Sequence, residues 1–165
     1  MSTSRFKENK TLVVKKSKNG EGLFSKVAFT PEQKIFEVTG TFVSGDIDDE
    51  MIDTTRSNTY RYNEDVYISP QGRVGDFLNH SCNPNTKVIK EKSKLYIVAI
   101  KNIAPNREIM FDYSTTLASD DIWKMKCSCK STRCRGTIRR FISLPKEIRT
   151  RYIQQHIVPS YILEI

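Results

Sequence analysis

No stretch of the sequence approaches the run of about 18 apolar residues that a membrane-spanning helix needs. The start, Met1–Lys10, is polar and carries lysines, with no apolar stretch behind it to form a secretory signal. Internal repeats and low-complexity tracts are also absent. We therefore expect a soluble, intracellular protein without membrane association, and 165 residues suffice for one compact domain with a small appendage.

Acidic residues are outnumbered, because 27 lysines and arginines face 19 aspartates and glutamates and give a net charge of +8. This excess predicts long-range attraction to acidic partners and weakly favours chromatin or nucleic acid. The alternative is an ordinary solvated face of lysines near the start of the chain. The run Asp46–Asp53 reverses the charge locally, and such dense like charges belong on a surface loop or exposed helix.

Short β-branched or alternating runs, separated by glycine and proline, predict many short strands. They are Thr11–Val14, Leu23–Val27, Lys34–Val38, Lys87–Lys90, Leu95–Ile100 and Arg107–Tyr113. Lys87–Lys90 and Leu95–Ile100 suit a hairpin around a polar tip that has no glycine. Only the tail from Pro145 to about Gln155 reads as helical, with Pro145 in the first turn and Pro159 as the stop.

Seven consecutive polar or turn-forming residues, Asn79–Asn85, follow the apolar pair Phe77-Leu78. Such a segment is not an ordinary strand or helix. Its polar groups must be satisfied by one another or by a ligand. A well-capped turn with a structural histidine is the alternative, since Asn-Pro is a frequent turn signal.

Cysteine is scarce, with four residues in all, and three of them fall within Cys127–Cys134. In an intracellular protein this spacing favours metal binding over disulfides. The paired Cys-x-x-Cys motifs of an independent zinc ribbon are missing. Four free thiols are the alternative.

Three motifs occur in a set order: Gly20-Glu21-Gly22, the Asn79–Asn85 string, and Glu108–Tyr113. Together they resemble the SET-domain protein lysine methyltransferases over about Leu12 to Gly136. The resemblance implies a mostly β (β-rich α+β) fold of several small curved sheets. In that fold the Asn79–Cys82 segment and the strand ending at Tyr113 cross as a pseudoknot.

The resemblance also implies a division of the chain. We expect a SET domain over 1–119 with a core of about 11–113, a post-SET zinc segment over 120–142 and a helical tail over 143–165. The only abrupt change of composition, near Asp120, lies at the first of these boundaries.

The activity implied is transfer of methyl groups from S-adenosylmethionine, with S-adenosylhomocysteine as product, to a lysine of a histone or another basic protein. In that family Gly20-Glu21-Gly22 corresponds to the turn against the methionine part of the cofactor, where glycine leaves room for close approach. Asn79 and His80 correspond to the pair that contacts its amino group and adenine. Tyr60 resembles a further wall of the cofactor pocket.

Tyr113 corresponds to the catalytic tyrosine, and Tyr67 resembles the second tyrosine of the narrow lysine channel. An ordinary half-buried strand tyrosine is the alternative for each. Phe111 stands where the family has phenylalanine or tyrosine, a choice that affects product multiplicity. Phenylalanine removes a hydroxyl that can hold a space-filling water, so we expect an enzyme capable of di- or trimethylation.

The pattern Cys127-x-Cys129-x-x-x-x-Cys134-x-Gly136 resembles the family's post-SET segment. The resemblance implies that its three cysteines join Cys82 around one tetrahedral, structural zinc ion with no open position. Asp46–Asp53 falls at the family's variable insert beside the substrate groove, where carboxylates suit a basic peptide. A merely solubilising loop is the alternative.

Three departures from the family pattern leave the reacting groups intact. Asn106-Arg107-Glu108-Ile109 replaces the common Gly-Glu-Glu-Leu, Asp76 stands where arginine is frequent, and no cysteine-rich cluster lies upstream. Two other functions therefore stay open: an inactive SET-like module that binds a lysine-containing tail, and a basic zinc protein that binds nucleic acid. The expected location is the nucleus or chromatin in a eukaryote, or the cytoplasm or an exported effector in a bacterium.

Overall fold

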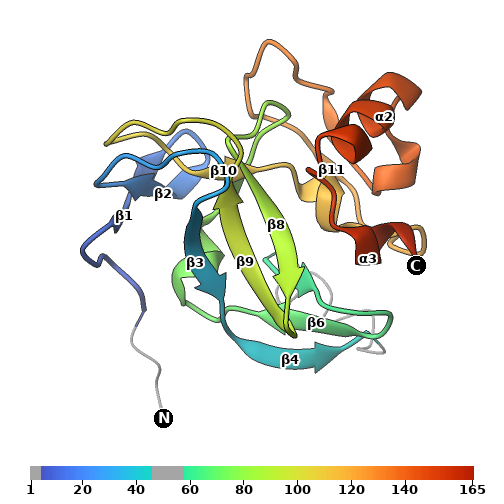
Figure 1. The fold of residues 1–165 in the computed structure, drawn as a ribbon, viewed down its shortest axis with the longest axis horizontal. Helices are drawn as coiled ribbons and strands as arrows, with labels where there is room; N and C mark the ends of the chain where they lie inside the picture. Colours follow the sequence, from blue (N-terminus) through green and yellow to red (C-terminus); the bar gives the residue numbers. More distant parts are fainter. Residues whose placement is uncertain (1–4, 46–57) are drawn as a thin grey trace.

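The computed structural model describes residues 5–45 and 58–165, and sheets dominate it (Figure 1). Within these residues the strands form three two-stranded and two three-stranded sheets, and the helices are few and short. This confirms the predicted mostly β class of several small sheets. No helix in the part of the chain that the structure describes is long and apolar enough to cross a membrane.

The first sheet is the antiparallel hairpin of β1 (Leu12–Ser17) and β2 (Gly20–Ser25). Gly20 follows the hairpin turn with a φ of +92°, a conformation that side chains rarely adopt. β1 extends three residues beyond the predicted run Thr11–Val14. β2 begins before the predicted run Leu23–Val27, because Gly20 and Gly22 are themselves part of the strand.

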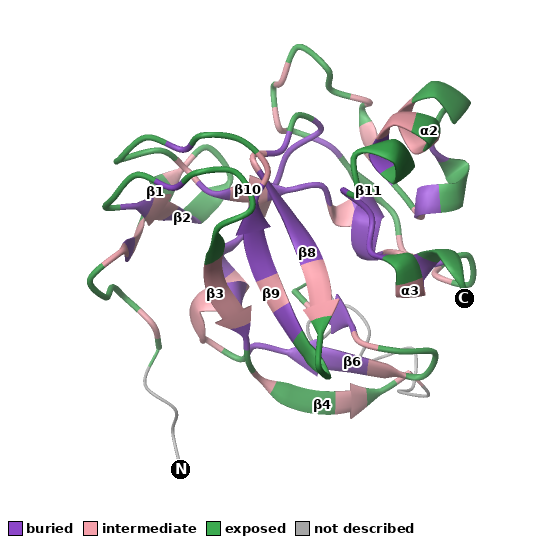
Figure 2. Cartoon of the chain, viewed as in Figure 1, coloured by how far each residue is buried: buried purple, intermediate pink, exposed green. Residues whose placement is uncertain are grey.

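The central sheet has the order β3-β9-β8, from β3 (Lys34–Val38), β9 (Lys94–Ala99) and β8 (Thr86–Glu91). The predicted hairpin between the last two is confirmed. Lys92 and Ser93 form its tip with φ values of 45° and 63°, so two non-glycine residues adopt the left-handed conformation that matches the twist of the strands. Figure 2 shows how much of β8 and β9 is buried.

The second three-stranded sheet has the order β4-β6-β5. Its strands are β4 (Thr41–Ser44), β6 (Val66–Ser69) and β5 (Tyr60–Arg61), and the 3-10 helix η2 (Val74–Phe77) follows them. The acidic run Asp46–Asp53, between β4 and β5, lies outside the described residues.

A two-stranded parallel sheet joins β7 (Asn79–His80) to β10 (Met110–Phe111). Met110 pairs with Asn79, and Phe111 pairs with His80. The two segments that we expected to cross therefore lie side by side. The predicted strand Arg107–Tyr113 is regular only over β10, because Tyr113 already begins the 3-10 helix η3 (Tyr113–Thr116).

The last part of the chain packs beside β8, opposite the β1–β2 hairpin (Figure 1). β11 (Met125–Lys126) and β12 (Thr137–Ile138) flank the cysteine loop and pair antiparallel. η4 (Phe141–Ser143), α2 (Lys146–Gln154) and α3 (Ser160–Leu163) follow. The predicted helix is confirmed as α2, although Pro145 precedes its first turn and a short helix follows Pro159.

Three clusters of buried apolar residues support this arrangement. The largest lies under the sheets and includes Leu23, Ile97 and Ile109, each 0% exposed. A second packs α2 and α3 onto the body through Phe141 and Tyr152. The third surrounds Cys82 and Cys127, with Tyr113 and Trp123 packed against it.

A buried ion pair ties these parts together. The Asp112 side chain is 0% exposed, and the Arg135 guanidinium binds both of its oxygens, at 2.8 Å to Oδ1 and 2.7 Å to Oδ2. The Tyr152 hydroxyl donates to the same carboxylate at 3.0 Å, as does the Ser114 backbone N–H at 3.1 Å. One carboxylate therefore connects the end of β10 to the cysteine loop and to α2.

A second buried arginine anchors the segment that precedes the cysteine loop. The Arg61 side chain is 1% exposed and binds both carboxylate oxygens of Asp120, at 2.6 and 2.9 Å. It also pairs with Asp121 at 3.0 Å. The segment at Asp120, where the composition of the sequence changes, is therefore attached to β5.

We expect that Arg135→Ala lowers the free energy of unfolding by about 3–5 kcal/mol, because the substitution leaves the Asp112 carboxylate buried without its cation. Arg139→Ala is the matched control, since Arg139 is exposed, and we expect a change within about 0.5 kcal/mol. Urea unfolding followed by circular dichroism measures both. Equal stability of the two variants would contradict the assigned role of the ion pair.

Candidate active site

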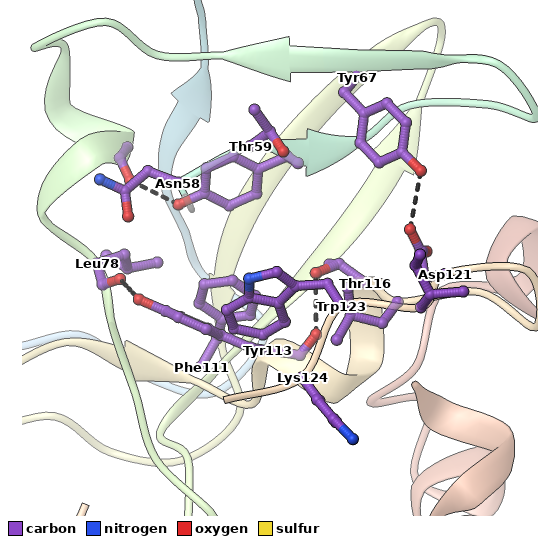
Figure 3. A pocket seen from close by; sticks show the side chains of 14 residues that line it. Asn58, Thr59, Tyr67, Leu78, Phe111, Tyr113, Thr116, Asp121, Trp123 and Lys124 are labelled. Carbon is purple, nitrogen blue, oxygen red and sulfur yellow. Dashed lines mark hydrogen bonds between the residues drawn. The ribbon is translucent and has the colours of Figure 1, made fainter. Parts of the chain in front are cut away.

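A cavity of about 330 Å³ lies beside Tyr113, and aromatic side chains form much of its wall (Figure 3). Phe111 ends β10 and Tyr113 begins η3, whereas Tyr60 comes from β5 and Tyr67 from β6. Trp123, just before the cysteine loop, contributes a further wall. The cavity therefore draws its aromatic residues from segments distant in the sequence.

Tyr113 sits at this cavity as a neutral, oriented phenol. Its hydroxyl donates to the Leu78 carbonyl oxygen at 2.6 Å (Figure 3). Burial raises the pKa of Tyr113 well above its ordinary value, and the negative charges of Glu108 and Asp76 act in the same direction. The side chain therefore keeps its proton at neutral pH and cannot serve as a strong base.

Tyr60 lies against Phe111 on the same aromatic wall. Its ring stacks on that of Phe111 with the centroids 5.6 Å apart, and the hydroxyl donates to the Gly75 carbonyl oxygen at 2.7 Å. The residue is only 2% exposed. We expected Tyr60 at a cofactor pocket with Gly22 and Asn79; the structure places it in the cavity beside Phe111, whose lining includes neither of those residues.

Tyr67 lines the cavity from another side. Its hydroxyl donates to Asp121 Oδ1 at 2.8 Å (Figure 3). The other oxygen of Asp121 accepts the Ala118 backbone N–H at 2.7 Å and pairs with Arg61. Tyr67 is therefore attached to the segment that leads into the cysteine loop, so this segment helps to shape the cavity.

Trp123 and Asp121 are cavity residues that the sequence reasoning did not single out. Trp123 is the only tryptophan of the chain and stands four residues before Cys127. A lone, large aromatic residue next to a predicted metal loop was an available signal. The sequence gives no such signal for Asp121, because two consecutive aspartates are also typical of an exposed acidic turn.

Other predicted cofactor residues gather around Asn79, which follows the cavity residue Leu78. The Asn79 side-chain amide donates to the Glu21 carbonyl oxygen at 2.9 Å and to Glu108 Oε1 at 2.8 Å. The Ser17 hydroxyl donates to the same Glu108 oxygen at 2.7 Å. A polar cluster therefore forms where the β1–β2 hairpin meets the ends of β7 and β10.

Gly22 leaves room for this cluster. A Cβ at position 22 would lie 2.3 Å from Glu108 Oε1 and 2.9 Å from Ser17 Cβ, so a larger residue would displace the Glu108 side chain from Asn79. Glu21, its neighbour, directs its carboxylate outward to an ion pair with Arg5. The structure thus brings Gly22, Glu21 and Asn79 together, as predicted, and adds Glu108.

Four potential metal ligands converge below Asn79: His80, Cys82, Cys127 and Cys129 have ligand atoms within 4.8 Å of one another. The sulfur atoms of Cys82 and Cys127 are 3.8 Å apart. A tetrahedral zinc ion with Zn–S bonds of about 2.3 Å separates its sulfur ligands by about 3.8 Å. Cys134, the remaining predicted ligand, interacts with the thiols of Cys127 and Cys129. All four cysteines are free of disulfides.

His80 fits a supporting role at this cluster better than a ligand role. Its Nδ1 accepts the Tyr113 backbone N–H at 3.1 Å, and burial lowers the pKa of the ring to about 4. The neutral ring must therefore carry its proton on Nε2, which faces Cys82 Sγ at 3.3 Å. The Arg135 backbone N–H also donates to Cys82 Sγ, at 3.4 Å. Two N–H donors suit a metal-bound thiolate.

The cysteine loop also reaches the β1–β2 hairpin. The Ser128 hydroxyl donates to Asn19 Oδ1 at 3.0 Å, across 109 positions of sequence. His80 connects Cys82, whose sulfur lies 3.8 Å from that of Cys127, to the backbone N–H of Tyr113. The aromatic cavity, the polar cluster and the thiol cluster thus form one connected site.

The family described as "SET domain" matches residues 20–114. Similar curated proteins are an H3 lysine-36 specific histone-lysine N-methyltransferase of Aspergillus oryzae, 30% identical over 138 residues, and human histone-lysine N-methyltransferase SETD1B, 31% identical over 148 residues. The matches cover 76% and 81% of this chain. The chain spans only 14% and 7% of the length of these two relatives.

Solved structures share the fold. The methyltransferase domain of human SETMAR matches 78% of this chain and 58% of that chain, with a TM-score of 0.62 and 22% identity. KRYPTONITE, in complex with mCHH DNA, an H3(1-15) peptide and SAH, matches 78% of this chain and 29% of that chain, with a TM-score of 0.60 and 20% identity. Because the family match covers more than half of its 165 residues, the chain belongs to the SET domain family.

Proposed function

We propose that this chain transfers methyl groups from S-adenosylmethionine to the ε-amine of a lysine in a protein substrate. One observation carries the proposal: the aromatic cavity and the polar Gly22–Asn79 cluster meet at the consecutive residues Leu78 and Asn79. At this point Tyr113 presents an oriented phenol to the cavity. Membership of the SET domain family and the activity named for the relatives support it.

The aromatic cavity suits the chemical problem that lysine poses. A lysine amine has a reference pKa near 10.4, and making it neutral at pH 7 costs about 4.6 kcal/mol. A channel walled by Tyr60, Phe111 and Trp123 disfavours the ammonium form by desolvation. S-adenosylmethionine, when bound, would supply an electrophilic methyl group on a positively charged sulfur.

Tyr113 would orient the amine. Its proton is committed to the Leu78 carbonyl, so the lone pairs of the phenol oxygen are left to accept a hydrogen bond from the nitrogen. For well-oriented reactants, holding the nucleophile in line in this way lowers the activation barrier by several kcal/mol. We assign Tyr67 and Tyr60 to the walls of the same lysine channel.

The polar cluster would hold the cofactor. Gly20-Glu21-Gly22 offers backbone without obstructing side chains, and Asn79 and His80 offer amide and backbone groups of β7. The Glu108 carboxylate, which meets Asn79 at 2.8 Å, gives the cluster a negative group suited to a cationic amino group. Glu108 is therefore added to the predicted cofactor residues.

A structural zinc ion held by Cys82, Cys127, Cys129 and Cys134 would complete the site. The 3.8 Å sulfur separation and the two N–H donors to Cys82 support this ligand set. The metal would fold a loop that has little core of its own. We accordingly propose a post-SET segment over 120–142, preceded by a SET domain over 1–119 and followed by a helical tail over 143–165.

The proposed substrate is a histone or another basic protein. The relatives are named as histone-lysine methyltransferases, and the KRYPTONITE structure includes an H3(1-15) peptide. An inactive SET-like module would need the same channel to bind a lysine side chain. Catalytic turnover, measured with the whole chain, separates the two.

We expect Tyr113→Phe to reduce methyl transfer about 100-fold while S-adenosylmethionine still binds, because the nitrogen loses its orienting oxygen. Transfer of labelled methyl to histones measures the rate, and calorimetry measures cofactor binding. Tyr96→Phe, on β9 and outside the cavity, is the matched control and should keep full activity. Unchanged transfer by the Tyr113 variant would refute the assigned role.

We expect about one zinc ion per chain, as a closed four-thiolate site requires. Chelation should abolish transfer and also expose the 127–136 loop to protease, because the loop loses its cross-link. Elemental analysis and proteolytic mapping report the two effects, and added zinc should reverse both. Full activity in chelated, zinc-free protein would rule out a closing role for the metal.

Phe111→Tyr should shift the product toward monomethyl-lysine, because a hydroxyl beside Tyr113 can hold a water in the space needed for added methyls. Phe111 and Tyr113 both line the cavity, and the centroids of their rings are 4.9 Å apart. A hydroxyl added to the Phe111 ring would therefore belong to the cavity wall. Mass spectrometry of a peptide product at long reaction times measures the distribution. A wild-type product with only one methyl would show that another group already restricts the site.

A further inference from the structure

A second cavity, of about 250 Å³, lies between the cysteine loop and α2, with a lining that shares no residue with the aromatic cavity. Three cations from separate segments converge on it: Lys101 after β9, Arg133 in the cysteine loop, and Arg151 on α2. We propose that this cavity binds a phosphate group of a polynucleotide backbone.

Positive charge prevails in the lining of this cavity, where Cys82, as the proposed zinc-bound thiolate, stands against three cations. No carboxylate lines it, and none of its three cations forms an ion pair within residues 5–45 and 58–165. The nearby Arg135, by contrast, is neutralised by Asp112. Burial and the charge of Arg133 both lower the pKa of Lys101, so the cations repel one another in the absence of an anion.

The remaining polar lining suits phosphate. Asn83 and Gln155 add side-chain amides that can donate hydrogen bonds to phosphate oxygens. Arginine guanidinium groups match phosphate geometry, and a lysine adds a mobile point charge. Two guanidinium groups, one ammonium and two amides around one small hollow make up an anion-binding set.

The exposure of the cavity favours a polymer over a small ligand. Lys101, Arg133 and Gln155 are exposed, so an anion bound here stays at the protein surface, where a continuous backbone can reach it. The net charge of +8 would add long-range attraction to such a polymer. Free inorganic phosphate has the same chemistry, and the experiment distinguishes the two sources.

The test uses the whole chain and a short random-sequence DNA duplex, with binding followed by fluorescence anisotropy over a series of salt concentrations. The cavity variant carries Lys101→Gln, Arg133→Gln and Arg151→Gln. The control variant carries Lys7→Gln, Lys10→Gln and Lys92→Gln, which remove the same charge from exposed positions outside the cavity.

We expect the cavity variant to bind the duplex about tenfold more weakly than the control variant, with the slope of log affinity against log salt reduced by about one. Equal affinities of the two variants would overturn the proposal. Lys101→Gln alone, on an exposed side chain, repeats the comparison should the triple variant misfold.

Inorganic phosphate, compared with chloride at equal ionic strength, provides the second arm. If phosphate displaces the duplex from the wild type but not from the cavity variant, the DNA backbone binds at this cavity. If phosphate raises the melting temperature of the wild type but the wild type does not bind the duplex, the proposal of a polynucleotide ligand is overturned. The cavity would then be a site for free phosphate. Because the readout is binding, its failure would not affect the proposed methyl transfer.

Discussion

The buried ion pair of Asp112 and Arg135 is the constraint on which the rest of the site depends. Asp112 immediately precedes Tyr113 in the sequence, and its carboxylate cannot stay buried without its cation. Arg135 can reach it only when the cysteine loop is docked, and Tyr152 only when α2 is in place. The position of Tyr113 is therefore coupled to two elements that lie far along the chain.

Buried contacts join the segments on the two sides of Asp120. Asp120 and Asp121 bind the buried Arg61 of β5, and Trp123 then closes a wall of the cavity. A SET domain cut at residue 119 would keep Tyr113 but lose that wall, the partners of Arg61 and the partner of Asp112. The proposed methyl transfer consequently belongs to the chain as a whole.

The sequence predicts those elements that are determined by interactions within a few residues. Lys34–Val38, the β8–β9 hairpin and α2 follow from alternation and helical periodicity, which act within a few residues. The strands β7 and β10 have two residues each, too few for any period, and they form because two distant segments pair with each other. For the same reason, no local pattern predicts that Tyr60 packs against Phe111 or that Arg135 binds Asp112.

One departure from the family pattern preserves the backbone conformation. Asn106 stands where the family commonly has glycine and adopts a φ of 63°, a left-handed conformation that asparagine tolerates better than most residues. Charge balance matters most at the cavity, where an unpaired Asp121 carboxylate would favour a protonated substrate lysine and oppose transfer. The Arg61 guanidinium, 3.0 Å from Asp121, offsets that charge from below the wall. An arginine buried to 1% exposure is costly in a small domain, and this electrostatic requirement of the proposed reaction accounts for its place beneath Tyr67.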